Sequence, residues 1–173
     1  VSGGGMPRAA LAGSRQLLEQ LAPLGPVYQA GTLSGNPVAT ACGLATLQEI
    51  AQPGFYDALA KKTRALVDGL TSAAKEAGLP FAADCEGGMF GFFLLPELPQ
   101  NYGAVMKSDA AKFGKLFHGL LERGVYIAPA LYEAGFVSAA HSGQDIEETV
   151  AAARGVFATL WAPHRLSASV PQV

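Results

Sequence analysis

The chain has 173 residues, 14 of them acidic and 12 basic, which gives a formal net charge of −2. Apolar residues make up 50% and charged residues only 15%, a composition that excludes a disordered tail and predicts a buried core. Lysine and arginine are scattered along the sequence, which argues against a nucleic-acid ligand. We therefore expect one or two globular domains.

The cysteines and the uncharged stretches exclude further classes of protein. Cys42 and Cys85 are too few for a disulfide framework and lack the spacing of a zinc site, so we expect free, buried thiols and no bound metal. The longest uncharged stretch, residues 20–48, contains several prolines and is no membrane helix. The first residues also lack the order of a signal peptide, so we expect a soluble cytoplasmic protein.

Residues 1–52 are expected to belong to one structural layer. A short alanine-rich run over residues 9–12 predicts a strand, and leucines at helical spacing then predict a helix of modest length that ends before Pro23. Asn36 is a good helix cap, and Pro37 is a good first residue of a helix. We expect that helix to run to about residue 50.

Residues 53–163 are predicted to form a compact α+β unit. A helix over about 55–77 has leucines on one stripe and Gly78 as its stop, and two apolar runs, 79–85 and 89–95, predict a hairpin. After the hairpin we expect a loop over 96–106, a helix that is capped by Ser108 and ended by Gly124, and strands over 125–127 and 136–139. A last helix is expected to begin with the Ser142–Asp145 capping box, to have Trp161 on its inner face and to end at Pro163. A flexible tail is expected over 164–173.

One segment, residues 31–36, is unusually rich in small and polar residues. Amides exposed by glycine, a hydroxyl from Thr32 or Ser34, and the start of the helix after Asn36 could together bind a phosphate group. A capped helix that follows a tight turn explains the same residues without a ligand, and spacing alone favours this simpler interpretation.

Several blocks of sequence resemble one enzyme family. They lie in the same order as in the glutamate-1-semialdehyde 2,1-aminomutases, which are class III pyridoxal-phosphate aminotransferases of fold type I. The blocks are Gly3–Pro7, Gly25–Pro37, Gly87–Phe90, Glu133–Phe136 and Ala140–Ser142. The resemblance implies an α/β fold, with 1–52 as the end of the cofactor-binding large domain and 53–163 as the C-terminal α+β small domain. It also implies a homodimer that isomerises glutamate 1-semialdehyde to 5-aminolevulinate in tetrapyrrole (porphyrin) biosynthesis.

The resemblance also assigns roles to individual residues. Gly31 and Thr32 would hold the phosphate of pyridoxal 5'-phosphate in the neighbouring subunit, with Tyr28 near the same active-site wall. Glu133 would lie close to the substrate, where a carboxylate could steady an ammonium group or share a proton with it. An exposed loop carboxylate explains Glu133 equally well.

The resemblance implies, further, that the chain starts just after the family's Schiff-base lysine and is a C-terminal fragment, inactive on its own. We expect the six lysines present to face solvent from helices or their ends (Lys61, Lys62, Lys75, Lys107, Lys112 and Lys115). His141 is expected to form a hydrogen bond with the backbone near Ser142. Two alternatives stay open: a class III aminotransferase that releases a keto product, and a non-catalytic dimerisation module.

Overall fold

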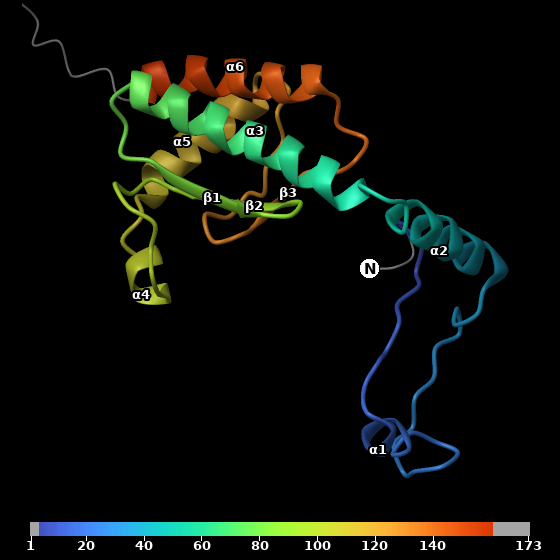
Figure 1. The fold of residues 1–173 in the computed structure, drawn as a ribbon. Helices are drawn as coiled ribbons and strands as arrows, with labels where there is room; N and C mark the ends of the chain where they lie inside the picture. The colour runs from blue at the N-terminus through green and yellow to red at the C-terminus, as the bar shows by residue number, and fades with distance from the viewer. Residues whose placement is uncertain (1–3, 161–173) are drawn as a thin grey trace, which may run out of the picture. The chain divides into compact units, whose positions relative to one another are not determined.

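The computed structural model describes residues 4–160, which divide into two compact units between Phe55 and Tyr56 (Figure 1). The predicted tail over 164–173 and the predicted positions of Trp161 and Pro163 lie outside the described residues. Within residues 4–160, no helix is both long and apolar enough to cross a membrane.

The first unit contains two helices, α1 (Arg15–Leu18) and α2 (Pro37–Ile50). The prediction of α2 is confirmed, with Asn36 as its N-cap and Pro37 as its first residue. The helix predicted before Pro23 is only one turn long, because the chain turns back after Leu18 and Leu21 forms an isolated bridge with Val27.

This turn brings the backbone into close contact with itself. The Val27 amide donates to the Gln20 carbonyl at 2.9 Å, and the Ala22 amide donates to the Val27 carbonyl at 2.8 Å. A Cβ on Gly25 would lie 2.2 Å from the Gln20 carbonyl oxygen. Gly25 is therefore required by the path of the backbone, and this part of the family-like block Gly25–Pro37 has a structural explanation.

The strand predicted over residues 9–12 is wrong. Residues 8–14 form neither helix nor strand, and Leu11 is 70% exposed. A strand is stabilised by hydrogen bonds to a neighbouring strand, and no described segment pairs with this run.

The second unit is a three-stranded antiparallel sheet with helices on one face (Figure 1). The sheet order is β1-β2-β3, and the helices α3, α5 and α6 gather on the same side of it. The elements are α3 (Phe55–Glu76), β1 (Ala82–Glu86), β2 (Met89–Phe93), α4 (Tyr102–Val105), α5 (Ala110–Leu121), β3 (Gly135–Phe136) and α6 (Gly143–Leu160).

The core lies between the helices and the sheet. Each of the three long helices contributes fully or nearly fully buried side chains, among them Leu66, Val67, Leu116, Val156 and Phe157. Burial of one such side chain stabilises the fold by about 1.5–3 kcal/mol, so this shared core is the main source of stability. The stripe of leucines predicted for α3 is confirmed, because Leu66 and Leu70 are buried and Leu59 packs against the core.

The predicted hairpin is also confirmed. Ala82 pairs with Phe93 at its open end and Glu86 with Met89 at the turn. Gly87 has a φ of +55°, a conformation that residues with a side chain rarely adopt.

Helix α5 begins one residue later than predicted. Its cap is Asp109, whose carboxylate accepts from the Lys112 amide at 3.0 Å. Ser108 is buried, and its hydroxyl accepts from the Leu94 amide at 3.2 Å. The serine therefore satisfies a buried amide beyond the end of β2, where an unpaired N–H would be costly. The helix itself ends at Leu121, and the predicted stop, Gly124, has a φ of +80° and ends the turn that follows.

Three other predictions in this unit need correction. The loop expected over 96–106 contains the short helix α4, and residues 125–127 form no strand. Val125 and Ile127 instead pack against the core from an irregular segment. The strand expected over 136–139 has only two residues, Gly135–Phe136.

The predicted capping box at the start of α6 is confirmed. The Ser142 amide donates to the Asp145 carboxylate at 2.6 Å, and the Asp145 amide donates to the Ser142 hydroxyl at 3.1 Å. Each side chain thus satisfies an amide that the helix leaves unpaired.

We expect the change Gly135→Ala to destabilise the second unit. A Cβ at this position would lie 2.2 Å from the Phe90 ring, which packs against the core, so strand or ring must move at a cost of about 1–3 kcal/mol. Gly114→Ala is the matched control, because a Cβ there would meet nothing within 4 Å outside the backbone of its own helix, and alanine favours a helix. Urea denaturation measures both, and equal stability of the two variants would contradict the prediction.

Candidate functional site

The segment with the predicted phosphate-binding residues forms two overlapping turns. The Ser34 amide donates to the Gly31 carbonyl at 2.9 Å, and the Asn36 amide donates to the Leu33 carbonyl at 3.1 Å. Gly35 has a φ of +78°, which lets the chain reverse before it enters α2. Thr32 lies near the tip of this compact loop.

Thr32 is exposed and unengaged. Among the residues that the structure describes, none forms a hydrogen bond with its hydroxyl or with its amide. A hydroxyl and an amide on the same residue can both donate to an anion. This residue therefore has the free donors that phosphate binding requires.

The first turn of α2 has less to offer. The Asn36 side-chain oxygen accepts from the Val38 amide at 3.0 Å and from the Ala39 amide at 3.2 Å, and Pro37 has no amide hydrogen. The helix contributes its dipole at this end, but these amides already have a partner. Any phosphate contact in this segment must therefore come chiefly from the turn around Thr32.

A cation lies one turn further along α2. The Arg8 guanidinium donates to the Thr40 hydroxyl at 2.9 Å, which ties the segment after the glycine run to the helix. Tyr28, the residue suggested for an active-site wall, is 82% exposed. Cys42, expected to be buried, is a half-buried free thiol.

Glu133 lies in the second unit, on a short segment anchored at both ends. Leu131 on one side is buried in the core, and Gly135 on the other side pairs with Phe90 of β2. The carboxylate of Glu133 is exposed and borders a pocket of about 360 Å³ on the sheet, together with Cys85 and Glu86. A carboxylate held in this way is accessible to a ligand in the pocket.

Two other groups in this pocket, the thiol of Cys85 and the carboxylate of Asp84, are less suited to react with a ligand. Burial raises the pKa of the Cys85 thiol, so the thiolate that would act as a nucleophile is disfavoured. Cys85 is half-buried, not buried as predicted. The pKa of Asp84 lies below its ordinary value, because its carboxylate accepts from the Cys85 amide at 2.8 Å and from Arg64 at 3.2 Å. Glu133 has no such partner among the described side chains.

Two of the six lysines predicted to face solvent are half-buried and have partners. Lys112 forms an ion pair with Asp109 at 3.3 Å. Lys62 was expected to face solvent, but it is half-buried and donates to the carbonyls of Ala139 and His141. His141 forms its hydrogen bond with the backbone at Ser138, whose amide donates to Nδ1 at 2.9 Å, and not at Ser142. No local pattern could have indicated the contacts of Lys62, because residues 77 and 79 positions away provide the acceptors.

The predicted site residues belong to two different units. Gly31 and Thr32 are neighbours in the first unit, and Glu133 belongs to the second unit. In the part of the chain that the structure describes, no group of three or more histidine, cysteine or acidic residues could hold a metal ion.

Solved structures identify the fold. The chain is similar to an omega-transaminase from Sphaerobacter thermophilus, with a TM-score of 0.79 and 27% identity over 92% of this chain and 37% of that one. A structure described as a transaminase with PLP bound aligns with a TM-score of 0.72 at 24% identity over 87% of this chain and 34% of that one. The fold is therefore α/β and is part of a fold type I pyridoxal-phosphate-dependent transferase.

Sequence comparisons then give the family. The model of the family described as "Aminotransferase class-III" matches residues 1–136, so the chain belongs to the class III aminotransferases. A glutamate-1-semialdehyde 2,1-aminomutase of Paracidovorax citrulli is 76% identical over 157 residues, and one of Acidovorax ebreus is 73% identical over 160 residues. These alignments cover 91% and 92% of this chain, but the chain spans only 36% and 37% of those relatives.

We expect Asn36→Ala to loosen the first turn of α2 by about 1 kcal/mol, because the Val38 and Ala39 amides lose their acceptor. Hydrogen exchange at these two amides measures the effect. Asn101→Ala, which removes the equivalent cap from α4, is the control and should leave exchange at α2 unchanged. Unchanged protection of Val38 and Ala39 in Asn36→Ala would contradict the assignment of the cap.

Proposed function

We propose that this chain is part of a glutamate-1-semialdehyde 2,1-aminomutase, a cytoplasmic enzyme that converts glutamate 1-semialdehyde to 5-aminolevulinate for tetrapyrrole synthesis. The observation that carries the proposal is the identity of 76% over 157 residues with a protein of that name. Proteins that share so much sequence share most side chains of their sites, whereas the omega-transaminase, at 27%, supports only the wider family.

The proposed cofactor is pyridoxal 5'-phosphate. When bound, it supplies an aldehyde that condenses with amino groups and a ring that takes up the electrons of a carbanion. The free hydroxyl and amide of Thr32, beside the positive end of α2, fit its phosphate group, and Gly31 lets the phosphate approach the backbone. Ser34 is less suited, because its amide already donates to the Gly31 carbonyl.

We propose that this phosphate belongs to a second copy of the chain in a homodimer. The support is the resemblance that assigns Gly31 and Thr32 to the neighbouring subunit, together with the exposure of both residues. An exposed polar turn can reach a partner's ligand without leaving a buried polar group unsatisfied.

Glu133 is the proposed substrate residue. Its carboxylate has no described partner, and its backbone is held between the core and β2. Such a group can orient the substrate's ammonium by charge or accept and return a proton as the amino group changes position. Because the chain spans only 36% of the Paracidovorax citrulli relative, activity is measured on the full-length protein.

The decisive experiment supplies glutamate 1-semialdehyde to the full-length protein with cofactor but no second amino acceptor. An aminomutase accumulates 5-aminolevulinate. A keto product that appears only when a separate amino donor and acceptor are present would instead indicate an ordinary aminotransferase. Absence of turnover together with dimer formation in sedimentation would favour the non-catalytic module.

We expect Thr32→Val to raise the Kd for pyridoxal phosphate roughly ten- to a hundredfold, because one hydrogen bond to a charged group is lost. Thr32→Ser retains the hydroxyl and is the matched control, with affinity close to that of the unmodified protein. Fluorescence or absorbance titration of the apo-enzyme measures both. If valine binds the cofactor as well as serine does, the phosphate contact lies elsewhere.

A further inference from the structure

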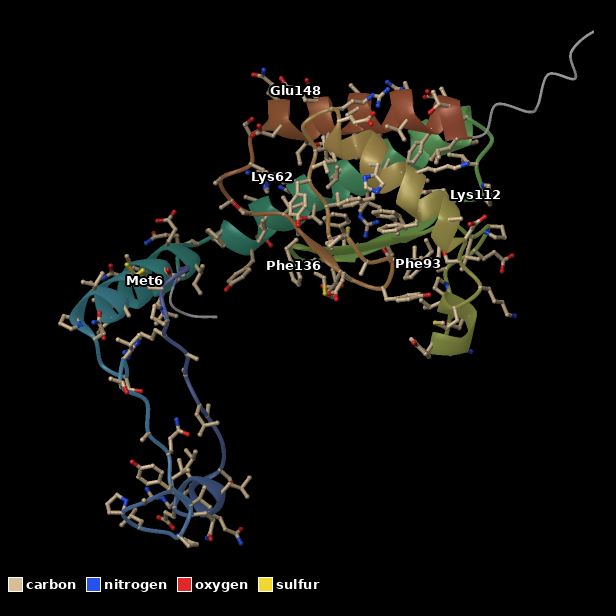
Figure 2. The ribbon with its side chains drawn as sticks, turned by 180° about the vertical axis from the view of Figure 1, so that it is seen from behind. Met6, Lys62, Phe93, Lys112, Phe136 and Glu148 are labelled. Atoms are coloured by element: carbon tan, nitrogen blue, oxygen red, sulfur yellow. The ribbon has the colours of Figure 1, made fainter. Side chains whose placement is uncertain are left out.

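Lys62 is joined to a segment far along the chain. Its ammonium donates to the Ala139 carbonyl at 2.9 Å and also to the His141 carbonyl. In Figure 2, Lys62 lies beside the chain that leads from β3 into α6. One cation on α3 therefore binds two carbonyls of the connection between β3 and α6, which begins after Phe136.

The environment of Lys62 differs from that of a solvated surface lysine. The residue is half-buried, and its ammonium forms no ion pair with any carboxylate that the structure describes. The next residue, Thr63, is fully buried and donates to the Leu59 carbonyl at 2.9 Å, which holds this turn of α3 against the core. Lys62 thus projects from a rigid base.

The connection that Lys62 contacts is itself ordered by short-range hydrogen bonds. The Ser138 amide donates to His141 Nδ1 at 2.9 Å, and the Ala140 amide donates to the Ser138 hydroxyl at 3.0 Å. Within this ordered segment, the carbonyls of Ala139 and His141 both accept from the Lys62 ammonium. A cation with three donors suits this arrangement.

The charge of Lys62 also acts on the start of α6. The pKa of Asp145 lies below its ordinary value, mainly because the Ser142 hydroxyl and amide donate to its carboxylate, and the positive charge of Lys62 makes the smallest contribution. Lys62 therefore adds slightly to what favours the charged form of Asp145 in the first turn of α6.

Glu133 lies on the other side of β3 from this connection, two residues before Gly135. Strand β3 pairs with β2 through only two residues, Gly135 and Phe136, and the Val137 amide adds one bond to the Gly88 carbonyl at 2.8 Å. So short a strand is weakly held by its own ladder. A second fixed point beyond β3 limits how far the strand, and the glutamate before it, can shift.

We propose that Lys62 is a positioning residue for Glu133: by holding the carbonyls of Ala139 and His141, it fixes the exit of β3 and thereby the carboxylate that meets the substrate. This inference rests on the proposed function, because it assigns Lys62 an effect on turnover. Lys62 does not itself touch the substrate.

The test compares Lys62→Met with Lys61→Met in the full-length enzyme. Lys61 is the exposed neighbour on α3, and among the described residues it has no hydrogen-bond partner. Methionine keeps the length of the side chain and removes the charge. We expect Lys62→Met to lower kcat about tenfold or more while KM and the thermal midpoint change little, and Lys61→Met to leave all three unchanged. Lys62→Arg, which can still donate to both carbonyls, should recover much of the rate.

A double-mutant cycle with Glu133→Gln separates positioning from general stability. If Lys62 acts through Glu133, then Lys62→Met should change kcat less than about twofold when Glu133 is already glutamine. Multiplicative losses in the double variant, or an equal loss of rate in Lys61→Met, would overturn the proposal.

Hydrogen exchange distinguishes two outcomes: that Lys62 does not position this segment, or that the proposed function is wrong. Amides of residues 138–142 should lose protection in Lys62→Met but not in Lys61→Met, whatever reaction the enzyme catalyses. If these amides lose protection but the enzyme forms no 5-aminolevulinate, the Lys62 contact is supported and the proposed function is rejected. Unchanged protection of these amides would reject the role of Lys62 even where turnover is as proposed.

Discussion

Strand β3 and strand β2 approach each other at Gly135 and Phe90 more closely than a side chain at residue 135 would allow. The Phe90 ring occupies the space of the missing Cβ and packs against the core that the helices form with the sheet. Because this contact brings β3 to the sheet, it also sets the position of the residues on either side of it. Glu133 lies two residues before Gly135, and the connection held by Lys62 begins after Phe136.

Polar groups in both units are divided between those that hold the backbone and those that stay free. In the first unit, Asn36 satisfies the opening amides of α2 and Thr32 keeps its donors. In the second unit, Arg64 pairs with Asp84 at 3.2 Å while Glu133 has no described partner. Removal of a holding group costs local stability, whereas removal of a free group should change binding or rate. This difference makes the two kinds of residue separable by experiment.

Membership of the class III aminotransferases and the similarity to aminomutases give these free groups a chemical meaning. A donor pair on an exposed turn fits an anionic phosphate, and an unpaired carboxylate on an anchored loop fits an ammonium or a proton in transit. Cys85, in the same pocket as Glu133, has its pKa raised by burial and remains a thiol.

Elements with strong local signals could be predicted from the residues alone. Asn36 followed by Pro37 marked the start of α2, the serine and aspartate of the capping box marked the start of α6, and the two glycines between apolar runs marked the hairpin. In each case the physical cause lies within a few residues, because caps and tight turns are satisfied by near neighbours. The family resemblance was likewise visible in short blocks, and it suggested Thr32 and Glu133.

Features that depend on distant partners became evident only in the folded chain. Residues 9–12 and 125–127 have apolar runs that suit a strand, but a strand also needs a neighbour, which the described structure does not provide for them. Ser108 was expected to cap a helix and instead satisfies the Leu94 amide, and Lys62 was expected in solvent and instead binds carbonyls 77 and 79 residues away. Sequence patterns indicate which groups require a hydrogen-bond or packing partner, and tertiary packing decides which partner is close enough to provide it.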